Sequence, residues 1–519
     1  MFGIWSIIPP LVAVGLAIWT KRVIFSLFIS VWVGGLIFTG GHPLAAVGAS
    51  FDWIKDVMID PWDARFLVLT LLLGSGAAFM FKTGGSHALT RVLEKKLTNG
   101  KRSQLLAWIL GIVVFFNDYA NSVIVGNASR DINAKYKVSR EKLSYILDST
   151  ASPMATFGPI SDWIGYQVGL IGAAFVALKI VDVKAYFVFL QSIPWNFYCI
   201  LSLIAVPMLI LGKDFGPMAD AELRAKKTGK LVADGGTPLS SVEADLGKVT
   251  NAEKASIWNF ILPLVTLIGV GIWAIWYTGG GGTGKSLMDA LADTEVDIAL
   301  TWAAFAMTVV GLILALIHGI SLGECEKIVM GGFKTMLPAV VIMVLAWSVG
   351  SVCSSLGTAD FVVNATKSWM SAALLPFIIF LICMFISFAT GTSWGTMAII
   401  TPIGVPLAYA IGGIPLVTIA IGSVFAGAIF GDHCSPISDT TVMSSIFAES
   451  DHIAHVTTQI PYAMVVAGIS AVLYLLSPMI KNAFVLLAVG IVAQFFILRY
   501  LGNSYQSKFS KEDRLLLEQ

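Results

Sequence analysis

The residues of this 519-residue chain best suited to chemistry are a few ionisable side chains inside long apolar segments. An ionisable group within a membrane segment costs about 2.5–3.5 kcal/mol on insertion scales, so such residues usually bind ions or substrates. The candidates are Asp118, Asp148, Asp162, Asp432, His433 and Asp439. Hydroxyl side chains lie close to most of them, and together with free backbone carbonyls they would form an oxygen-rich site suited to Na⁺. Helix capping, or pairing with a distant lysine, is the structural alternative for each carboxylate.

The composition identifies the elements that must position these side chains as membrane helices. Charged residues make up 13% of the chain and hydrophobic residues 56%, whereas soluble domains average about 25% charged residues. This excludes an ordinary soluble enzyme and a disordered protein, and a net charge of +1 gives no general attraction for nucleic acid. The five cysteines form no CxxC pattern, and no cofactor is expected. We therefore predict an all-α polytopic protein whose main partner is the lipid bilayer.

Basic residues predict an unusual element in the first half of the chain. They concentrate in residues 83–104 and 128–142, which should both be cytoplasmic. Only one apolar run, 105–127, separates them, and a single crossing cannot begin and end on the same side. The run should therefore be a re-entrant hairpin. A second hairpin is predicted at 372–403, and because basic residues are scarce beside it, it should open to the outside.

The two halves should be inverted-topology repeats, an arrangement typical of secondary transporters. Each repeat has three spans, a hairpin, a long interrupted span and one more span, and the total is about eleven spans plus two hairpins. The spans include the apolar runs 185–211 and 335–352, and the acid-rich loops 40–64 and 278–297 should lie outside. The interrupted spans are 143–180 and 414–447, and the sequence Pro159-Ile160-Ser161-Asp162 recurs at 436–439. The predicted units are a first repeat (1–212), a linker (213–256), a second repeat (257–478) and a further span with a tail (479–519). The linker and the tail should face the cytoplasm from the plasma (inner) membrane.

Three other patterns are weaker indications of function. Residues 279–286 fit GxxxxGK[ST], but they follow a membrane span rather than a strand, so a nucleotide site is not expected. Asp432 and His433 are adjacent and would point in different directions on a helix, so they do not form a catalytic triad with a serine, and no enzymatic activity is expected. His452 and His455 fall in an expected inner loop, where a solvated position is favoured over a role in pH sensing.

One segment resembles a known family. Gly431-Asp432-His433-Cys434-Ser435-Pro436-Ile437-Ser438-Asp439-Thr440-Thr441 is similar to the signature of NhaC-type Na⁺/H⁺ antiporters. The segments 118–122 and 148–153 resemble the first-half motifs of that family, and the similarity runs from about residue 66 to residue 463. The resemblance implies the ion transporter superfamily fold, with two inverted repeats and paired hairpins. It also implies a homodimer, because dimeric elevator-type members of that superfamily carry the site on a mobile domain past a fixed scaffold.

The resemblance also implies a set of site residues at the hairpin tips and the interrupted spans. These are Asn117, Asp118, Asn121, Asp148, Ser149, Thr392, Ser393, Asp432, Ser435, Asp439 and Thr440. His433 joins them as a group whose charge can change near neutral pH. Na⁺ and H⁺ would compete for Asp118, Asp432 and Asp439, because one carboxylate cannot hold both. Na⁺/H⁺ antiport is therefore the leading hypothesis.

His433 keeps an alternative function open. Antiporters that define the family often carry lysine at this position, whereas the His-Cys version is shared by relatives proposed to carry amino acids or other organic solutes with Na⁺. The alternative hypothesis is Na⁺-coupled symport of an amino acid or small organic acid. An ion channel is a third hypothesis, but paired inverted breaks favour alternating access.

Overall fold

The structure, a computed structural model, describes residues 2–20, 22–94, 97–115, 118–157, 162–180, 182–239, 255–286, 290, 294–358, 361, 365, 371 and 373–518. These residues form helices and turns, with no strand among them. Seven helices in these ranges are long and apolar enough to cross a membrane, or eight if the bent pair α11–α12 counts as one span. The chain is therefore an integral membrane protein.

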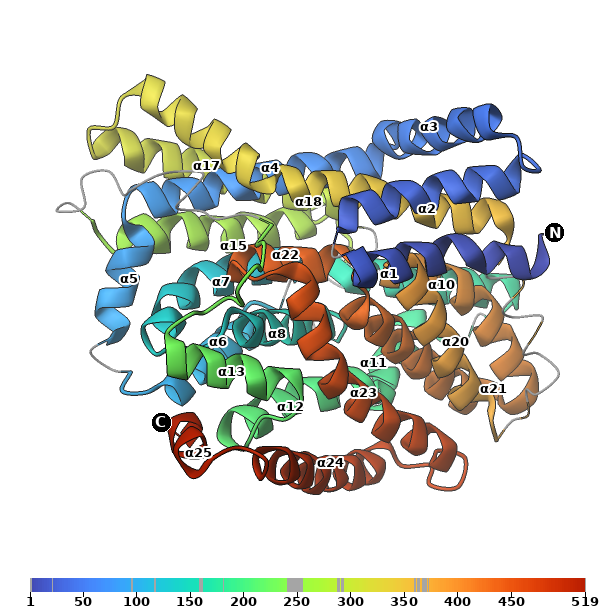
Figure 1. Cartoon of the computed structure of the whole chain (residues 1–519). Coiled ribbons are helices and arrows are strands. Elements are labelled where there is room, and N and C mark those ends of the chain that lie inside the picture. The colour runs from blue at the N-terminus through green and yellow to red at the C-terminus, as the bar shows by residue number, and fades with distance from the viewer. Residues whose placement is uncertain are drawn as a thin grey trace.

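Helices from both halves of the chain pack into a first layer, most of which runs along the top of Figure 1. It consists of α1 (Ile8–Thr20), α2 (Val23–Phe38), α3 (Pro43–Ile59), α4 (Pro61–Lys82), α15 (Trp258–Thr278), α17 (Val296–Ile317) and α18 (Leu322–Leu356). Glycines allow α4 and α18 to approach closely, since a Cβ on Gly74 would lie 2.7 Å from the carbonyl oxygen of Gly332. Small residues at such crossings are typical of membrane helix pairs.

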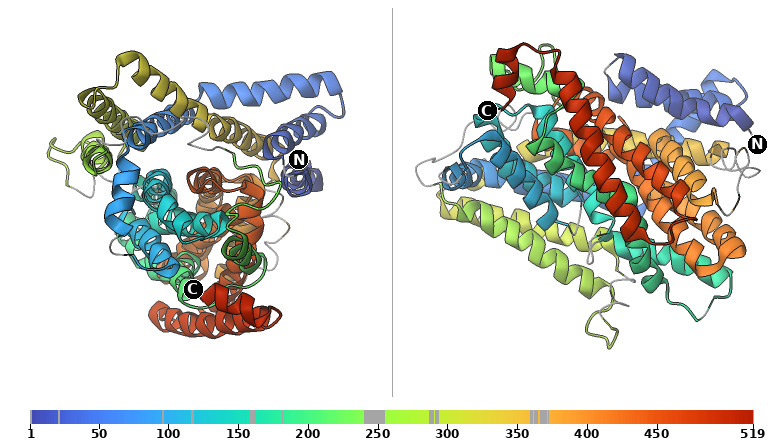
Figure 2. Two further views of the ribbon diagram at one scale, coloured as in Figure 1. Left: turned by 60° about the vertical axis from the view of Figure 1, so that its left-hand side comes forward. Right: turned by 90° about the horizontal axis from the view of Figure 1, so that it is seen from below.

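The remaining helices form a second layer, which contains all the predicted hairpins and interrupted spans (Figures 1 and 2). In the first half they are α5 (Gly85–Glu94), α6 (Gly100–Val113), α7 (Asp118–Lys135), α8 (Arg140–Thr150), α9 (Ser152–Ala155), α10 (Asp162–Ala177), α11 (Ala185–Ser192), η2 (Ile193–Trp195), α12 (Phe197–Leu211) and α13 (Pro217–Thr228). In the second half they are α20 (Leu375–Thr390), α21 (Ser393–Cys434), α22 (Asp439–Ala448), α23 (His452–Leu476), α24 (Ala483–Gln506) and α25 (Lys511–Glu518). A short 3₁₀ helix, η1 (Gly3–Ile7), precedes α1.

Helix breaks occur within the segments where the sequence predicts them. The α6–α7 pair and the α20–α21 pair each pack together across a short break. Gly413, with φ 62° and ψ −162°, divides α21 into two helices. The second of these ends at Cys434, and four residues separate it from the start of α22 at Asp439. How these pairs sit in a membrane, and whether the halves are inverted repeats, remain predictions.

Four elements differ from the sequence-based expectation. The expected outer loop at 40–64 contains α3, an amphipathic helix whose Ala46, Ser50, Trp53 and Val57 form one buried face. The charged residues on its other face made the segment resemble a loop. The linker begins with α13, which packs against α8 and α25. The run 185–211 is bent by 46° at η2, where Pro194 lacks a backbone donor. Helix α18 has 35 residues and extends well beyond the expected span at 335–352.

Candidate functional site

Asp432 lies on the last turn of α21, directly before the second-half break, which is the segment 435–438 between α21 and α22. Its side chain is buried, and three hydroxyls donate to it, one from the second hairpin tip and two from the segment where α22 begins. Ser438 Oγ lies 2.7 Å from Oδ1, while Ser393 Oγ and Thr440 Oγ1 lie 3.2 and 3.3 Å from Oδ2. The carboxylate therefore joins the second hairpin tip to both sides of the break. Among the residues that the structure describes, no lysine or arginine forms an ion pair with Asp432.

Glycine and capping residues shape the second hairpin tip. Gly391 ends α20 with φ +71°, a conformation that favours glycine. A Cβ there would lie 2.6 Å from the carbonyl oxygen of Ile437, so the tip rests directly on the break. Thr392 caps α21, accepting from the Gly395 backbone N–H at 3.3 Å, and Ser435 Oγ donates to the Phe388 carbonyl at 2.8 Å. Thr392 and Ser435 thus stabilise the backbone around Asp432.

The first hairpin tip, at the start of α7, contacts the first-half break, which lies between α8 and α9, in a similar way. Ser152 Oγ donates to Asp118 Oδ2 at 3.3 Å, as Ser393 does to Asp432 in the second half. Asn121 Nδ2 lies 2.6, 2.9 and 2.9 Å from the carbonyl oxygens of Gly111, Val114 and Thr150. Asn121 therefore ties together the ends of α6 and α8, where helical carbonyls lack intrahelical partners.

The two halves interlock through α22, which packs against α7 and α8. Tyr119 donates its hydroxyl hydrogen to Asp439 Oδ2 at 2.6 Å. Thr441 Oγ1 and Ser444 Oγ lie 3.0 and 3.4 Å from the oxygens of Asp148. Each of these contacts joins a residue of the first half to one of the second half, so both halves contribute to a single polar region.

His433 adjoins this region, on the turn that also carries Asp432. Its Nδ1 lies 2.8 Å from the Tyr198 hydroxyl and its Nε2 lies 3.1 Å from Ser149 Oγ. Its Nε2 is 3.9 Å from Asp148 Oδ2. His433, Ser149 and Asp148 are thus brought together as a second cluster beside the hydroxyl-ringed Asp432.

Sequence reasoning missed several residues of this second cluster. Gln459 Nε2 donates to Asp148 Oδ2 at 2.7 Å and also to the His433 carbonyl. The Nε2 of His455 lies 2.9 Å from Gln459 Oε1, and Ser445 Oγ lies 2.8 and 2.9 Å from the Nδ1 atoms of His455 and His452.

The expectation of a solvated loop at His452 and His455 was wrong, because both side chains are buried at the start of α23. The i, i+3 spacing of the two histidines after the capping Asp451 was the available indication of a shared helix face.

Some of the predicted residues lie outside the described part of the chain. They are Asn117 and residues 158–161, which include the first three residues of the first Pro-Ile-Ser-Asp sequence. Asp162 is the first residue of α10, and its side chain is likewise not described. The glycines at 279–284 form the turn after α15, a membrane-type helix rather than a strand.

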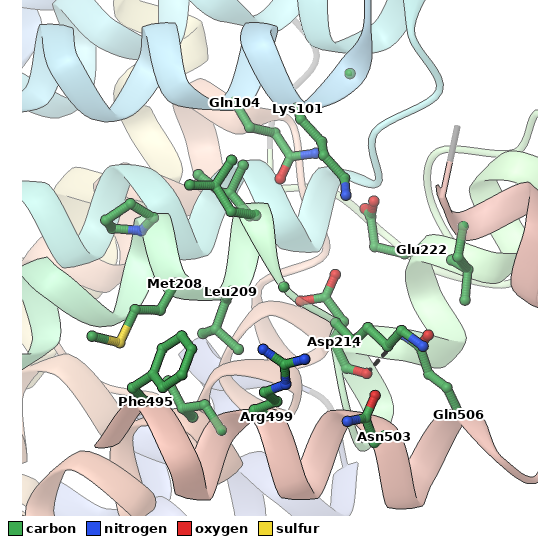
Figure 3. Close-up of a pocket in the computed structure, with 18 of the residues that line it drawn as sticks. Lys101, Gln104, Met208, Leu209, Asp214, Glu222, Phe495, Arg499, Asn503 and Gln506 are labelled. Atoms are coloured by element: carbon green, nitrogen blue, oxygen red, sulfur yellow. Dashed lines mark hydrogen bonds between the residues drawn. The ribbon is translucent and has the colours of Figure 1, made fainter. Parts of the chain in front are cut away.

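A cavity of about 790 Å³ lies away from these carboxylates, between α12 and α24 (Figure 3). None of the predicted site residues lines it. The carboxylates instead lie at tightly packed helix breaks.

Broken helices with buried carboxylates in an all-helical membrane protein define the class as a secondary transporter. The sequence matches the Na⁺/H⁺ antiporter family over residues 154–478, and the chain belongs to that family. The prediction from the signature segment is confirmed, as is the prediction that the protein is a transporter and not an enzyme.

Individual relatives differ in how much of the chain they match. An uncharacterised protein of Haemophilus influenzae is 32% identical over 488 residues, which cover 91% of this chain and 90% of that protein. The malate-2H⁺/Na⁺-lactate antiporter of Bacillus subtilis is 29% identical over 182 residues, 34% of this chain and 38% of that protein. The Na⁺/H⁺ antiporter NhaC of Alkalihalophilus pseudofirmus is 32% identical over 137 residues, 26% and 29% of the two chains.

Proposed function

We propose that this protein exchanges Na⁺ for H⁺ by alternating access, and that Asp432 is the main ion-binding carboxylate. The observation that carries the proposal is the ring of hydroxyls from Ser393, Ser438 and Thr440 around a buried carboxylate that no described lysine or arginine neutralises. A bare carboxylate at such a place needs a cation or a proton. Na⁺ and H⁺ therefore compete for it, and this competition couples the two fluxes.

The neighbouring residues have distinct parts in this proposal. Asp439 and Asp118 share the Na⁺ region with Asp432, and the hydroxyls of Ser393 and Thr440 replace water around the ion. Asp148, Ser149 and His433 form the adjoining cluster, with His433 as the proton-sensitive group. Asn121, Thr392 and Ser435 hold the tips and breaks in position through backbone contacts. Na⁺ and H⁺ are cargo, and no cofactor takes part.

The two helix layers support an elevator arrangement. The hairpins and breaks lie in the second layer, while α4, α17 and α18 belong to the first. We propose that the second layer moves the site past the first, that the two halves are inverted repeats, and that the protein forms a homodimer in the plasma membrane. Contact between α13 and α25, including the Lys227–Asp513 ion pair at 2.9 Å, supports placing the linker and the tail on the same, cytoplasmic side.

Reconstituted protein tests the exchange directly. Proteoliposomes carrying an imposed pH gradient should lose it on addition of Na⁺ and keep it on addition of K⁺ at the same ionic strength. If both salts leave the gradient intact in liposomes that contain folded protein, Na⁺/H⁺ exchange is refuted.

The second candidate is Na⁺-coupled symport of an amino acid or small organic acid. It is favoured by His433 and by relatives named for organic solutes, among them the malate-2H⁺/Na⁺-lactate antiporter and the arginine/ornithine antiporter of Halobacterium salinarum. A panel of radiolabelled amino acids and organic acids separates the two candidates. Uptake stimulated by an inward Na⁺ gradient would support symport, and no stimulated uptake across the panel would exclude it for those solutes.

A further inference from the structure

The cavity between α12 and α24 combines an apolar wall with a charged end (Figure 3). Its apolar wall includes Met208, Leu209, Phe495 and Leu498. Its charged end lies where α12 and α24 both finish, beside α13 of the linker and the start of α6. A site that is apolar on one side and charged on the other matches the boundary between lipid chains and headgroups.

The acidic groups of the cavity are already engaged by other residues. Asp214 accepts from the Lys142 ammonium group and from the Tyr462 hydroxyl. Glu222 Oε1 accepts from the backbone N–H and the hydroxyl of Ser139, at 2.8 and 2.7 Å. Asp214 is thus paired with Lys142, whereas the donors to Glu222 are neutral. Four cationic side chains also line the cavity and outnumber these two carboxylates: Lys101, Lys213, Lys226 and Arg499.

Two of the four cationic side chains face each other across the cavity. Lys101 reaches it from the first turn of α6 and Arg499 from α24, and Figure 3 shows the two on opposite sides of the opening. Within the described part of the chain, neither forms an ion pair. Gln104 lies one turn from Lys101, and its buried Oε1 has no hydrogen-bond partner among the described residues. The excess positive charge points to an absent negatively charged ligand, and the unpaired Gln104 oxygen, which is an acceptor, points to a hydrogen-bond donor such as a hydroxyl on that ligand.

Helix α24 shows that membrane lipid can reach this place. Only 28% of the apolar stretch of this helix is buried inside the protein, and Phe484, Phe496 and Tyr500 are among its exposed side chains. Acyl chains lying along such a helix would bring a headgroup to the charged end of the cavity. A water-soluble anion would leave the wall of Met208, Leu209 and Phe495 uncovered.

We propose that this cavity is a binding site for an anionic phospholipid. The phosphate lies between Lys101 and Arg499, the Gln104 amide oxygen accepts from a headgroup hydroxyl such as those of phosphatidylglycerol, and the acyl chains follow the wall formed by α12 and α24. The site is separate from Asp432 and does not depend on the proposed ion exchange.

Native mass spectrometry of the purified full chain tests the site. Delipidated protein is titrated with phosphatidylglycerol and with phosphatidylcholine of the same acyl chains. The wild type should bind phosphatidylglycerol more tightly, and the double variant Lys101→Ala/Arg499→Ala should lose about fivefold in affinity per cation removed, since one basic side chain near an anionic lipid contributes about 1 kcal/mol. Arg499→Gln, on the exposed face of α24, gives a single-charge variant should the double variant fail to fold.

Matched controls separate this site from general charge effects. Lys184→Ala/Lys481→Ala removes two exposed cations that lie away from the cavity, one before α11 and one before α24, and should leave the preference unchanged. Three results would overturn the proposal: no lipid preference in the wild type, the same preference in folded Arg499→Gln, or equal loss in the control. Displacement of the lipid by glycerol phosphate at lipid-like concentrations would also overturn it, because the site would then bind soluble anions.

Discussion

Replacing Asn121 by alanine should destabilise the contact between the first hairpin and the first-half break. The Asn121 amide faces three carbonyl oxygens, those of Gly111, Val114 and Thr150, and its two hydrogens can satisfy two of them at once. Each buried carbonyl left without a donor costs about 1–3 kcal/mol. We therefore expect the free energy of unfolding to fall by about 2–6 kcal/mol. Asn121→Asp keeps the size of the side chain but loses the donors, so it should be at least as destabilising.

Asn127→Ala is the matched control, because Asn127 is also buried on α7 but donates only to Val123 within its own helix. That carbonyl already accepts an intrahelical bond, so the expected loss is about 1 kcal/mol. Both variants are compared by reversible unfolding of purified protein in mixed detergent micelles. Equal destabilisation by Asn121→Ala and Asn127→Ala would refute the assignment of Asn121 as a link between helix ends.

Two further predictions concern the second hairpin and the linker. Gly391→Ala should sharply lower the yield of folded protein or the rate of Na⁺/H⁺ exchange, because a side chain at φ +71° would meet the Ile437 carbonyl. The control Gly350→Ala should be tolerated, because there is open space around Gly350. Equal tolerance of both variants would contradict the packing argument. Burial raises the pKa of Glu222, in the linker, to about 7, so the native state binds this proton more tightly than the unfolded chain. Stability from this group is therefore gained as pH falls from about 7 towards its ordinary pKa near 4.5. Thermal unfolding should show a smaller gain between about pH 8 and about pH 5.5 for Glu222→Gln than for the wild type, and an equal gain would contradict the prediction.

The parts of the site visible in the sequence were those with a large cost in a membrane. Asp118, Asp148, Asp432 and Asp439 stand out because carboxylates are rare in apolar segments, and the structure places all four at helix breaks. The breaks themselves were visible because prolines, glycines and hydroxyl residues interrupt otherwise apolar runs.

The missed parts depend on tertiary packing. Gln459 is a neutral amide on a long helix, and only the fold brings it to Asp148. His452 and His455 follow a short turn that the charged residues around it made look solvated, yet α23 packs back onto α8, α21 and α22 and buries them. Helices α3 and α13 were missed because each buries only one face, so their composition resembles that of a loop.

The central claim, that Asp432 couples Na⁺ to H⁺, is tested most directly by the Asp432→Asn variant in proteoliposomes with an imposed pH gradient. The substituted asparagine side chain keeps the shape of the aspartate but cannot exchange a proton for Na⁺. Asp52→Asn, at an exposed carboxylate of α3, is the control. We predict that Na⁺ dissipates the gradient with the wild type and the Asp52→Asn protein, and fails to do so with a folded Asp432→Asn protein. Dissipation at the wild-type rate by folded Asp432→Asn would contradict the account.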